Sequence, residues 1–187
     1  MKTFVIDLLK NKISPFYYYH SYKHTLYVVE KAIEIATREN CTEKEIELVS
    51  TAALWHDTGF INTYNDHEEE GCRLARKYLP GYGFTNEDIG KICGMIMATS
   101  IPQSPKTRLE EIVADADLEY LGTPDAASKA ERLFMEWKHL DDSWTRQKWN
   151  QTQINFLKNH HYFTRFCSEN REPAKLSYLE KLVAGNQ

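Results

Sequence analysis

The chain has 187 residues, of which 23 are Lys or Arg and 27 are Asp or Glu, giving a formal net charge of −4 at pH 7. A chain of this length fits one ordinary domain that buries roughly 70% of the surface exposed by its unfolded form. Its lysines and arginines are scattered rather than clustered, which argues against a protein of nucleic acids or membrane surfaces. We therefore expect no nucleic-acid partner and no membrane partner.

Cysteine usage and the N-terminal segment indicate the compartment. The first twelve residues hold only a short apolar run, which Asp7 interrupts, and no stretch approaches the ~20 apolar residues of a membrane span. A reduced setting fits cysteines that are widely spaced and form no CxxC pair. We expect a soluble, unprocessed, cytoplasmic protein with four free thiols, Cys41, Cys72, Cys93 and Cys167.

Apolar residues recur at helical spacing almost throughout, which predicts an all-α fold. The first clear helix begins after Ser21 and runs to about Asn40. A second begins after Thr42, which can form a capping box with Glu45. This second helix carries His56 on the same stripe as its apolar residues.

Three further helices are expected before the C-terminal region. One spans about 67–79, and its glutamates at 68–70 predict a solvated first turn that the helix dipole favours. The next is capped by Thr85, and another runs over about 107–121. The remaining helices, about 124–184, bring the expected total to about seven to nine in a single domain.

The adjacent pair His56 and Asp57 stands in the apolar run AALWHDTGF. A carboxylate in such surroundings costs several kcal/mol of desolvation unless it is paired or binds a cation. The pair therefore suggests a metal site. The alternative is that His56 is a hydrogen-bonded core histidine and that Asp57 caps a helix end.

Two histidines precede this pair in YYHSYKH. His20 lies just before the first clear helix and His24 lies inside it. The two imidazoles would approach one site from different directions, one as a ligand and one as a free acid. The alternative is a pair of surface histidines.

Two aspartates in VADADLEYLG complete the candidate ligand set. At about 100° per residue, Asp117 lies roughly 80° from the apolar stripe of its helix and Asp115 roughly 120°. We favour Asp117, and keep Asp115 as an alternative that orients a ligand or caps a neighbouring helix. Two imidazoles and two carboxylates suit a divalent transition metal.

With H…HD…D in this order, the chain resembles the HD-domain metal-dependent phosphohydrolase superfamily over about residues 16–122, which are the motif core of the expected domain. The phrase YHSYKH is similar to the YHNxxH segment of cyclic-nucleotide phosphodiesterases, which implies a general acid at His20. The sequence ADLEYLG resembles the segment that follows the last ligand in other members. The resemblance implies an HD-type helical bundle and four metal ligands, His24, His56, Asp57 and Asp117.

The resemblance is incomplete where two-metal members have further histidines. His67 in HEEEG resembles one of these positions, but the segment after Ile96 has Ala98, Thr99 and Ser100. We therefore expect one divalent ion (Mn, Fe, Co, Ni or Zn, with Mg also open) and no complete second site. His67 would contact a substrate phosphate or partly ligate a weak second ion; otherwise it is a solvated residue at a helix start.

The implied activity is hydrolysis of a phosphomonoester or phosphodiester, as a phosphatase or phosphodiesterase, on a nucleotide or related small molecule. A metal-activated water would attack phosphorus, Asp57 would orient that water, and His20 would protonate the leaving oxygen. Lys23, Lys106 and Arg108 are the nearest basic residues in sequence for phosphate, unless they are solvated surface charges.

The main alternative is a non-catalytic HD-like module that binds a nucleotide or a protein and holds a structural metal. An HD-type oxygenase would need ligands for a second iron. The aromatic C-terminal region most simply covers the core, although it also leaves a homodimer open.

Overall fold

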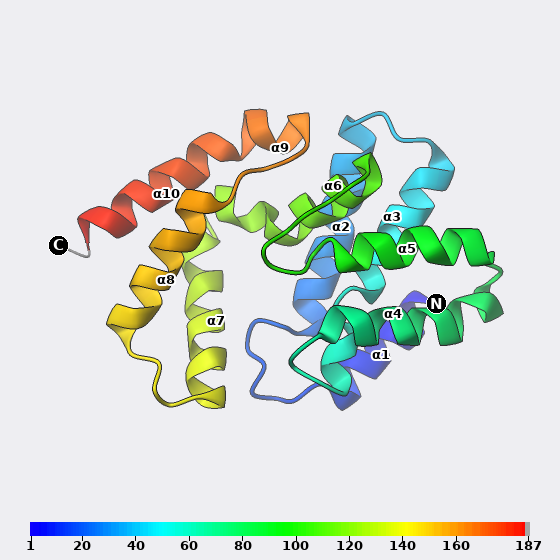
Figure 1. The fold of residues 1–187 in the computed structure, drawn as a ribbon, viewed down its shortest axis with the longest axis horizontal. Helices are drawn as coiled ribbons and strands as arrows, with labels where there is room; N and C mark the ends of the chain where they lie inside the picture. Colours follow the sequence, from blue (N-terminus) through cyan, green and yellow to red (C-terminus); the bar gives the residue numbers. More distant parts are fainter. Residues whose placement is uncertain (186–187) are drawn as a thin grey trace. The chain divides into compact units, whose positions relative to one another are not determined.

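The computed structural model describes residues 1–185, which form ten α-helices and three short 3₁₀ helices with no strand (Figure 1). The predicted all-α class is confirmed. The helix beyond the expected total is α1 (Lys2–Lys12), where Asp7 interrupts the apolar run. Asp7 is exposed, while Val5, Ile6 and Leu9 are buried on the opposite face, so the interruption does not break the amphipathic pattern.

The described residues divide into two compact units. The first unit comprises 1–14 and 20–117, and the second comprises 15–19 and 118–185. Each unit is described below by itself. The expectation of a single domain stays a prediction.

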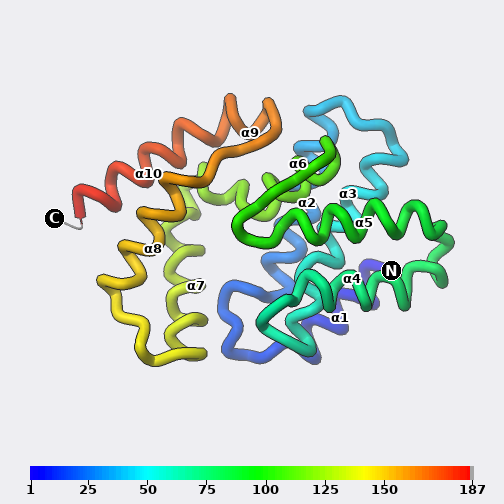
Figure 2. Tube along the Cα trace, in the orientation of Figure 1, coloured from blue at the N-terminus to red at the C-terminus, as the bar shows by residue number. Residues whose placement is uncertain are grey.

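The first unit is built from helical pairs (Figure 2). Helices α2 (Tyr22–Arg38) and α3 (Glu43–Trp55) pack side by side, as do α4 (His67–Tyr78) and α5 (Asn86–Met97). Helix α3 also packs against α5. The unit ends in α6 (Arg108–Leu118), and these boundaries agree with the sequence-based ones to within a few residues.

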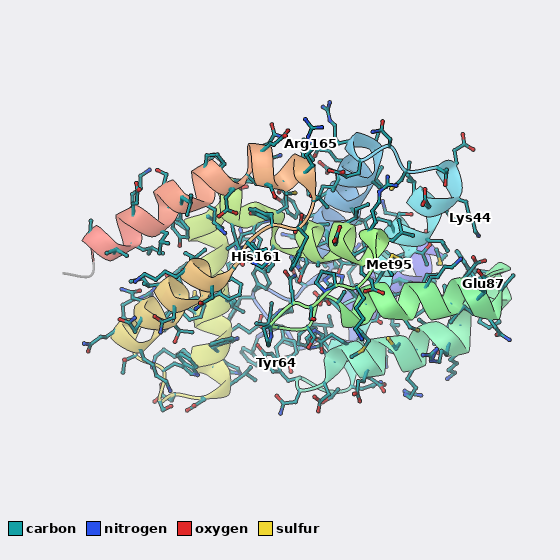
Figure 3. The ribbon with its side chains drawn as sticks, turned by 45° about the horizontal axis from the view of Figure 1, so that its top comes forward. Lys44, Tyr64, Glu87, Met95, His161 and Arg165 are labelled. Carbon is teal, nitrogen blue, oxygen red and sulfur yellow. The ribbon has the colours of Figure 1, made fainter. Side chains whose placement is uncertain are left out.

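Local caps explain why the boundaries were predictable. Thr42 and Glu45 form the expected capping box at the start of α3, and Thr85 forms a second one with Asp88. Lys44 then pairs with Asp88 at 3.2 Å, which joins the starts of α3 and α5. Figure 3 shows Lys44 and Glu87 at this same edge. Each cap contributes about 1 kcal/mol through contacts within four residues.

The second unit holds helices α7 (Ala126–Leu140), α8 (Arg146–Asn159), α9 (Arg165–Asn170) and α10 (Glu172–Ala184). Its aromatic side chains form a local core within the unit. Buried Phe134 and Trp149 pack with tilted rings, 5.8 Å apart between centroids. Trp137 and Trp144 pack against the same cluster and remain partly exposed.

A buried lysine marks the interior of the second unit. Lys175 has no exposed surface. Its Nζ donates to the carbonyl of His160, lies 3.2 Å from Nδ1 of the same residue, and pairs with Glu172 at 2.8 Å. The ammonium group is therefore satisfied by three acceptors, which offsets its desolvation.

The four cysteines are free thiols. Cys72 and Cys93 lie on α4 and α5, and each Sγ approaches the carbonyl of the other residue. Among residues 1–185, no helix combines the length and the apolar content that crossing a membrane requires.

Candidate metal centre

The packing of α2 against α3 brings two imidazoles together. His24 lies in the first turn of α2, and His56 directly follows Trp55, the last residue of α3. Their Nε2 atoms lie 3.4 Å apart. Both side chains are buried, so neither His24 nor His56 is a surface residue, and the two rings face each other inside the unit.

A backbone contact fixes the orientation of His56. Its Nδ1 lies 2.8 Å from the carbonyl oxygen of Ala53, to which it donates. The proton on Nδ1 leaves Nε2 to face His24 as a potential ligand atom. This is the arrangement that metal-binding histidines commonly adopt.

Asp57 reaches the same point because the helix ends before it. Its backbone angles, φ −95° and ψ 3°, start a 3₁₀ turn, η1 (Thr58–Ile61). The carboxylate places Oδ1 3.1 Å from His56 Nε2 and Oδ2 3.6 Å from His24 Nε2. Asp57 is only 3% exposed, and its Oδ2 accepts no hydrogen bond from any residue that the structure describes. A buried carboxylate oxygen of this kind suits a cation.

Asp117, near the end of α6, adds the fourth side chain. Its Oδ1 lies 2.9 Å from His24 Nε2 and 3.6 Å from His56 Nε2. Ligand atoms of His24, His56 and Asp117 all lie within 4.8 Å of one another. Neighbouring ligand atoms around an ion with bonds of ~2.1 Å stand roughly 3.0–3.4 Å apart, so this His/His/Asp cluster can hold a metal ion.

Burial and charge act in opposite directions on these groups. Burial disfavours the charged form of His56, yet the carboxylates of Asp57 and Asp117 raise its pKa well above the ordinary value. Burial likewise works against both carboxylates, but the imidazoles lower the pKa of each. The two carboxylates therefore favour a protonated His56, whose positive charge balances theirs in the way that a metal ion would.

The choice between the two aspartates rests on geometry rather than burial. Asp115 has no exposed surface, whereas the Asp117 side chain is 15% exposed. The projection that placed Asp117 closer to the buried stripe was therefore wrong about burial, because a projection around one helix takes no account of the elements packed against it. Asp117 is nevertheless the aspartate that lies against the two imidazoles.

Two further histidines flank the cluster. His20 lies before α2, with its ring centroid 6.2 Å from that of His24. His67 is the first residue of α4, and its Nε2 lies 3.8 Å from Asp57 Oδ1. Burial lowers the pKa of His67, which favours its neutral form. Six side chains thus gather in one region of the first unit: His20, His24, His56, Asp57, His67 and Asp117.

Glycine allows α4 to approach the cluster. A Cβ on Gly59 would lie 1.8 Å from the carbonyl oxygen of His67, so the 3₁₀ turn and the start of α4 touch through their backbones. A Cβ on Gly71 would lie 3.2 Å from the carbonyl oxygen of His56. The HxxxG spacing therefore has a packing reason: its glycine lies against the end of α3.

Glu68 corrects the expectation for the first turn of α4. We expected Glu68, Glu69 and Glu70 all to be solvated, but Glu68 is buried and its Oε2 lies 3.5 Å from His67 Nδ1. Glu70 instead pairs with Arg73 at the surface. Helix periodicity does place Glu68 and Gly71 on one face, and this was the available signal.

The basic candidates are spread over the first unit. Lys23 is exposed and adjoins His24 on α2. Arg108 begins α6, roughly 14 Å along the helix from Asp117, and Lys106 precedes it. Arg108 donates to the carbonyl of Glu39 at the far end of α2. The structure therefore does not bring Lys106 and Arg108 to the cluster.

Fold and site together define an all-helical protein with a buried His/His/Asp cluster suited to a metal ion. A family model for the HD domain matches residues 21–119, and the chain belongs to this family, whose members are generally hydrolases. None of the curated proteins matches the chain in sequence.

Two solved structures share the fold. A predicted HD superfamily hydrolase from an uncultured Thermotogales bacterium is 22% identical with a TM-score of 0.62, covering 98% of this chain and 91% of that one. The Bacillus subtilis protein YpgQ, solved in complex with ADP, is 18% identical with a TM-score of 0.65, covering 99% of this chain and 97% of that one. At these identities the likeness establishes the fold alone.

Proposed function

We propose that the chain is a metal-dependent phosphohydrolase that cleaves a phosphomonoester or phosphodiester of a nucleotide or related small molecule. One observation carries this proposal: the ligand atoms of His24, His56 and Asp117 lie within 4.8 Å of one another, with Asp57 against both imidazoles. Such a set of nitrogen and oxygen donors suits a divalent ion, and HD proteins use such ions for hydrolysis.

We assign the four ligands as His24, His56, Asp57 and Asp117. An ion held there supplies Lewis acidity, which activates water and offsets charge on phosphorus. Asp57 has a second role, because its buried Oδ2 is available to accept a hydrogen bond from the attacking water. The donor set is compatible with Mn, Fe, Co, Ni or Zn, with Mg also open.

His20 is the proposed general acid. It lies beside the cluster but outside the ligand set, with ring centroids 6.2 Å from both His24 and His67. A protonated imidazole at this place can donate its proton to the leaving oxygen as the phosphorus–oxygen bond breaks. Its loss should therefore lower turnover while the metal remains bound.

His67 and Lys23 are the proposed substrate contacts. His67 is close enough to Asp57 to meet a phosphate that is bound at the cluster, and its side chain keeps 19% exposure. A weak second ion on His67 and Asp57 is the alternative role. Lys106 and Arg108 are left out because they lie at the other end of α6.

The complex of YpgQ with ADP supports a nucleotide as the ligand. Recognition of a nucleotide by this chain is itself part of the proposal, as is the cytoplasm as its location. The experiment is to purify the protein without chelator, measure bound metal, and screen mononucleotides, cyclic nucleotides, nucleotide polyphosphates and simple phosphomonoesters with added Mn, Co, Ni or Mg.

Three outcomes separate the proposed functions. Metal-dependent turnover that His20→Ala lowers while metal content is unchanged supports the hydrolase. Metal and nucleotide binding without turnover would establish the non-catalytic module instead. Full metal retention by both His56→Ala and Asp117→Ala would refute the site itself.

A further inference from the structure

Phe60 is a buried aromatic ring, 4% exposed, that lies three residues after Asp57 in the 3₁₀ turn η1. It stacks on His20, with ring centroids 4.2 Å apart and planes at 30°. It also stacks on His67, at 3.8 Å and 20°. One phenyl ring therefore contacts both of the histidines that flank the metal cluster.

These two histidines reach the cluster from different parts of the chain. His20 precedes α2 and His67 begins α4, so no helix holds both of them. Their ring centroids are nevertheless only 6.2 Å apart. Stacking restricts the tilt and rotation of an imidazole, so a shared partner fixes the two rings relative to each other as well as to the cluster.

The turn that carries Phe60 is itself held in place by close contacts. Gly59 lets the turn that carries Phe60 contact the backbone of His67. Tyr64 packs edge-on against Phe60, with centroids 5.2 Å apart, and against His20 at 6.1 Å. Figure 3 labels Tyr64 in the segment between the turn and α4. Phe60 thus belongs to a packed aromatic group rather than to a mobile loop end.

We propose that Phe60 is a positioning residue, which holds His20 in place to donate its proton and His67 in place to meet the substrate phosphate. This inference rests on the proposed function. Phe60 itself contacts neither the metal nor the phosphate in this proposal, and acts through the two imidazoles. Its phenyl ring is required because a branched aliphatic side chain offers no flat face for either ring.

The first test compares Phe60→Leu with Phe134→Leu. Phe134 is a similarly buried phenylalanine, 7% exposed, in the core of the second unit. We expect both variants to melt at lower temperature and to keep full metal content. Phe60→Leu should also lower kcat by roughly 10- to 100-fold, as expected when a reacting group is misplaced, with a smaller change in KM. Equal kcat values for the two variants would overturn the proposal.

A double-variant cycle separates positioning from a general loss of stability. If Phe60 acts through the general acid, Phe60→Leu should lower kcat much less in a His20→Ala background than in the unmodified protein. An unchanged fold-effect in both backgrounds would mean that Phe60 does not act through His20.

The last readout does not depend on turnover. The ring current of Phe60 shifts the imidazole proton resonances of His20 and His67, so Phe60→Leu should move those resonances and leave those of His139 and His160 in place. Unmoved resonances of His20 and His67 would overturn the positioning role. If the unmodified protein hydrolyses no phosphoester yet these resonances move, the proposed function fails and the contact of Phe60 with the two imidazoles stands.

Discussion

His56 is buried in the first unit and His160 is half-buried in the second, and the charges beside them are opposite. His56 lies between the carboxylates of Asp57 and Asp117, which outweigh burial and raise its pKa well above the ordinary value. His160 lies against the ammonium group of Lys175, and burial together with that charge lowers its pKa to about 3. Removal from water works against a charged imidazole in both units, so the neighbours decide the outcome.

The hydrogen bonds of the two imidazoles also differ: Nδ1 of His56 faces an acceptor, whereas Nδ1 of His160 faces a donor. His56 uses Nδ1 to donate to a carbonyl and turns Nε2 toward other ligand atoms. In His160, Nδ1 instead lies 3.2 Å from the Lys175 Nζ, from which it accepts a hydrogen bond. A cation is favoured beside His56 and is disfavoured beside His160, where one is already built into the fold. The acidic neighbours therefore make His56, and not His160, the candidate metal ligand of this pair.

The largest expected effect comes from removing a carboxylate next to His56. Asp117→Asn should weaken metal binding by more than about 100-fold, since loss of a direct ligand exceeds the 10- to 100-fold cost of losing an outer contact. Asp115→Asn is the matched control and should keep most of the affinity. Titration of both variants with Mn or Zn in competition with a chelator measures this, and the opposite ranking would move the ligand role to Asp115.

Two glycines that touch a neighbouring backbone, one in each unit, test whether a substitution in one unit affects the metal cluster more than a substitution in the other. Gly59→Ala and Gly122→Ala would each force a Cβ against a neighbouring backbone, at His67 and Arg171 respectively. Each should cost about 1–3 kcal/mol of unfolding free energy, measured by denaturant titration. Only Gly59→Ala should also alter the region of the metal cluster and lower turnover.

A helical glycine with open surroundings is the control for these substitutions. A Cβ on Gly90, within α5, meets no atom within 4 Å. Gly90→Ala should therefore stabilise the protein by about 0.5–1 kcal/mol. If Gly90→Ala also lowered the free energy of unfolding, the close contacts at Gly59 and Gly122 would not explain the destabilisation of their alanine variants.

Metal affinity should fall as pH falls. The raised pKa of His56 means that its proton persists to higher pH than on a free imidazole, and this proton must leave before Nε2 can bind a metal. Below that pKa, apparent affinity should drop by about tenfold per pH unit. Calorimetric titrations at several pH values measure the slope and the protons released; a pH-independent affinity between pH 5 and 8 would contradict the assignment.

The second unit should show the opposite proton linkage. His160 has a folded pKa of about 3, below its unfolded value of ~6.5, so the unfolded chain binds the additional proton between these values. Stability is therefore complete above pH ~6.5 and is lost as pH falls toward 3, by at most about 1.4 kcal/mol per pH unit. His160→Asn should flatten this dependence in denaturant titrations, and an equally steep decline in the variant would assign the acid sensitivity elsewhere.

The smallest effect tests which factor governs His160. Burial is the largest cause of its lowered pKa, followed by the charge of Lys175 and then that of His161. Lys175→Met should therefore raise that pKa by about one unit or less, and leave it below ~6.5. Titration of the imidazole resonance by NMR measures the change. A return to the ordinary value would give the larger role to Lys175.

Helix boundaries were accessible from the sequence because they depend on neighbours in the chain. Thr42 and Thr85 cap their helices through residues three positions later. The helix α1 is not among the expected helices, because its apolar run is short and Asp7 interrupts it, although Asp7 lies on the exposed face. The residue types of the candidate ligands were also readable, since imidazoles and carboxylates in apolar runs need partners.

What the sequence alone determined is the all-helical class, the main caps, and a pool of histidines and aspartates with the chemistry of a metal ligand set. Tertiary structure decided which of them meet: Asp117 rather than Asp115 lies against His24, which is 93 residues away. It also buried Glu68, removed Arg108 from the cluster, and placed Phe60 against two distant imidazoles. Helical periodicity fixes a direction around one axis, whereas these contacts depend on how separate helices pack, and no pattern within a single helix specifies that.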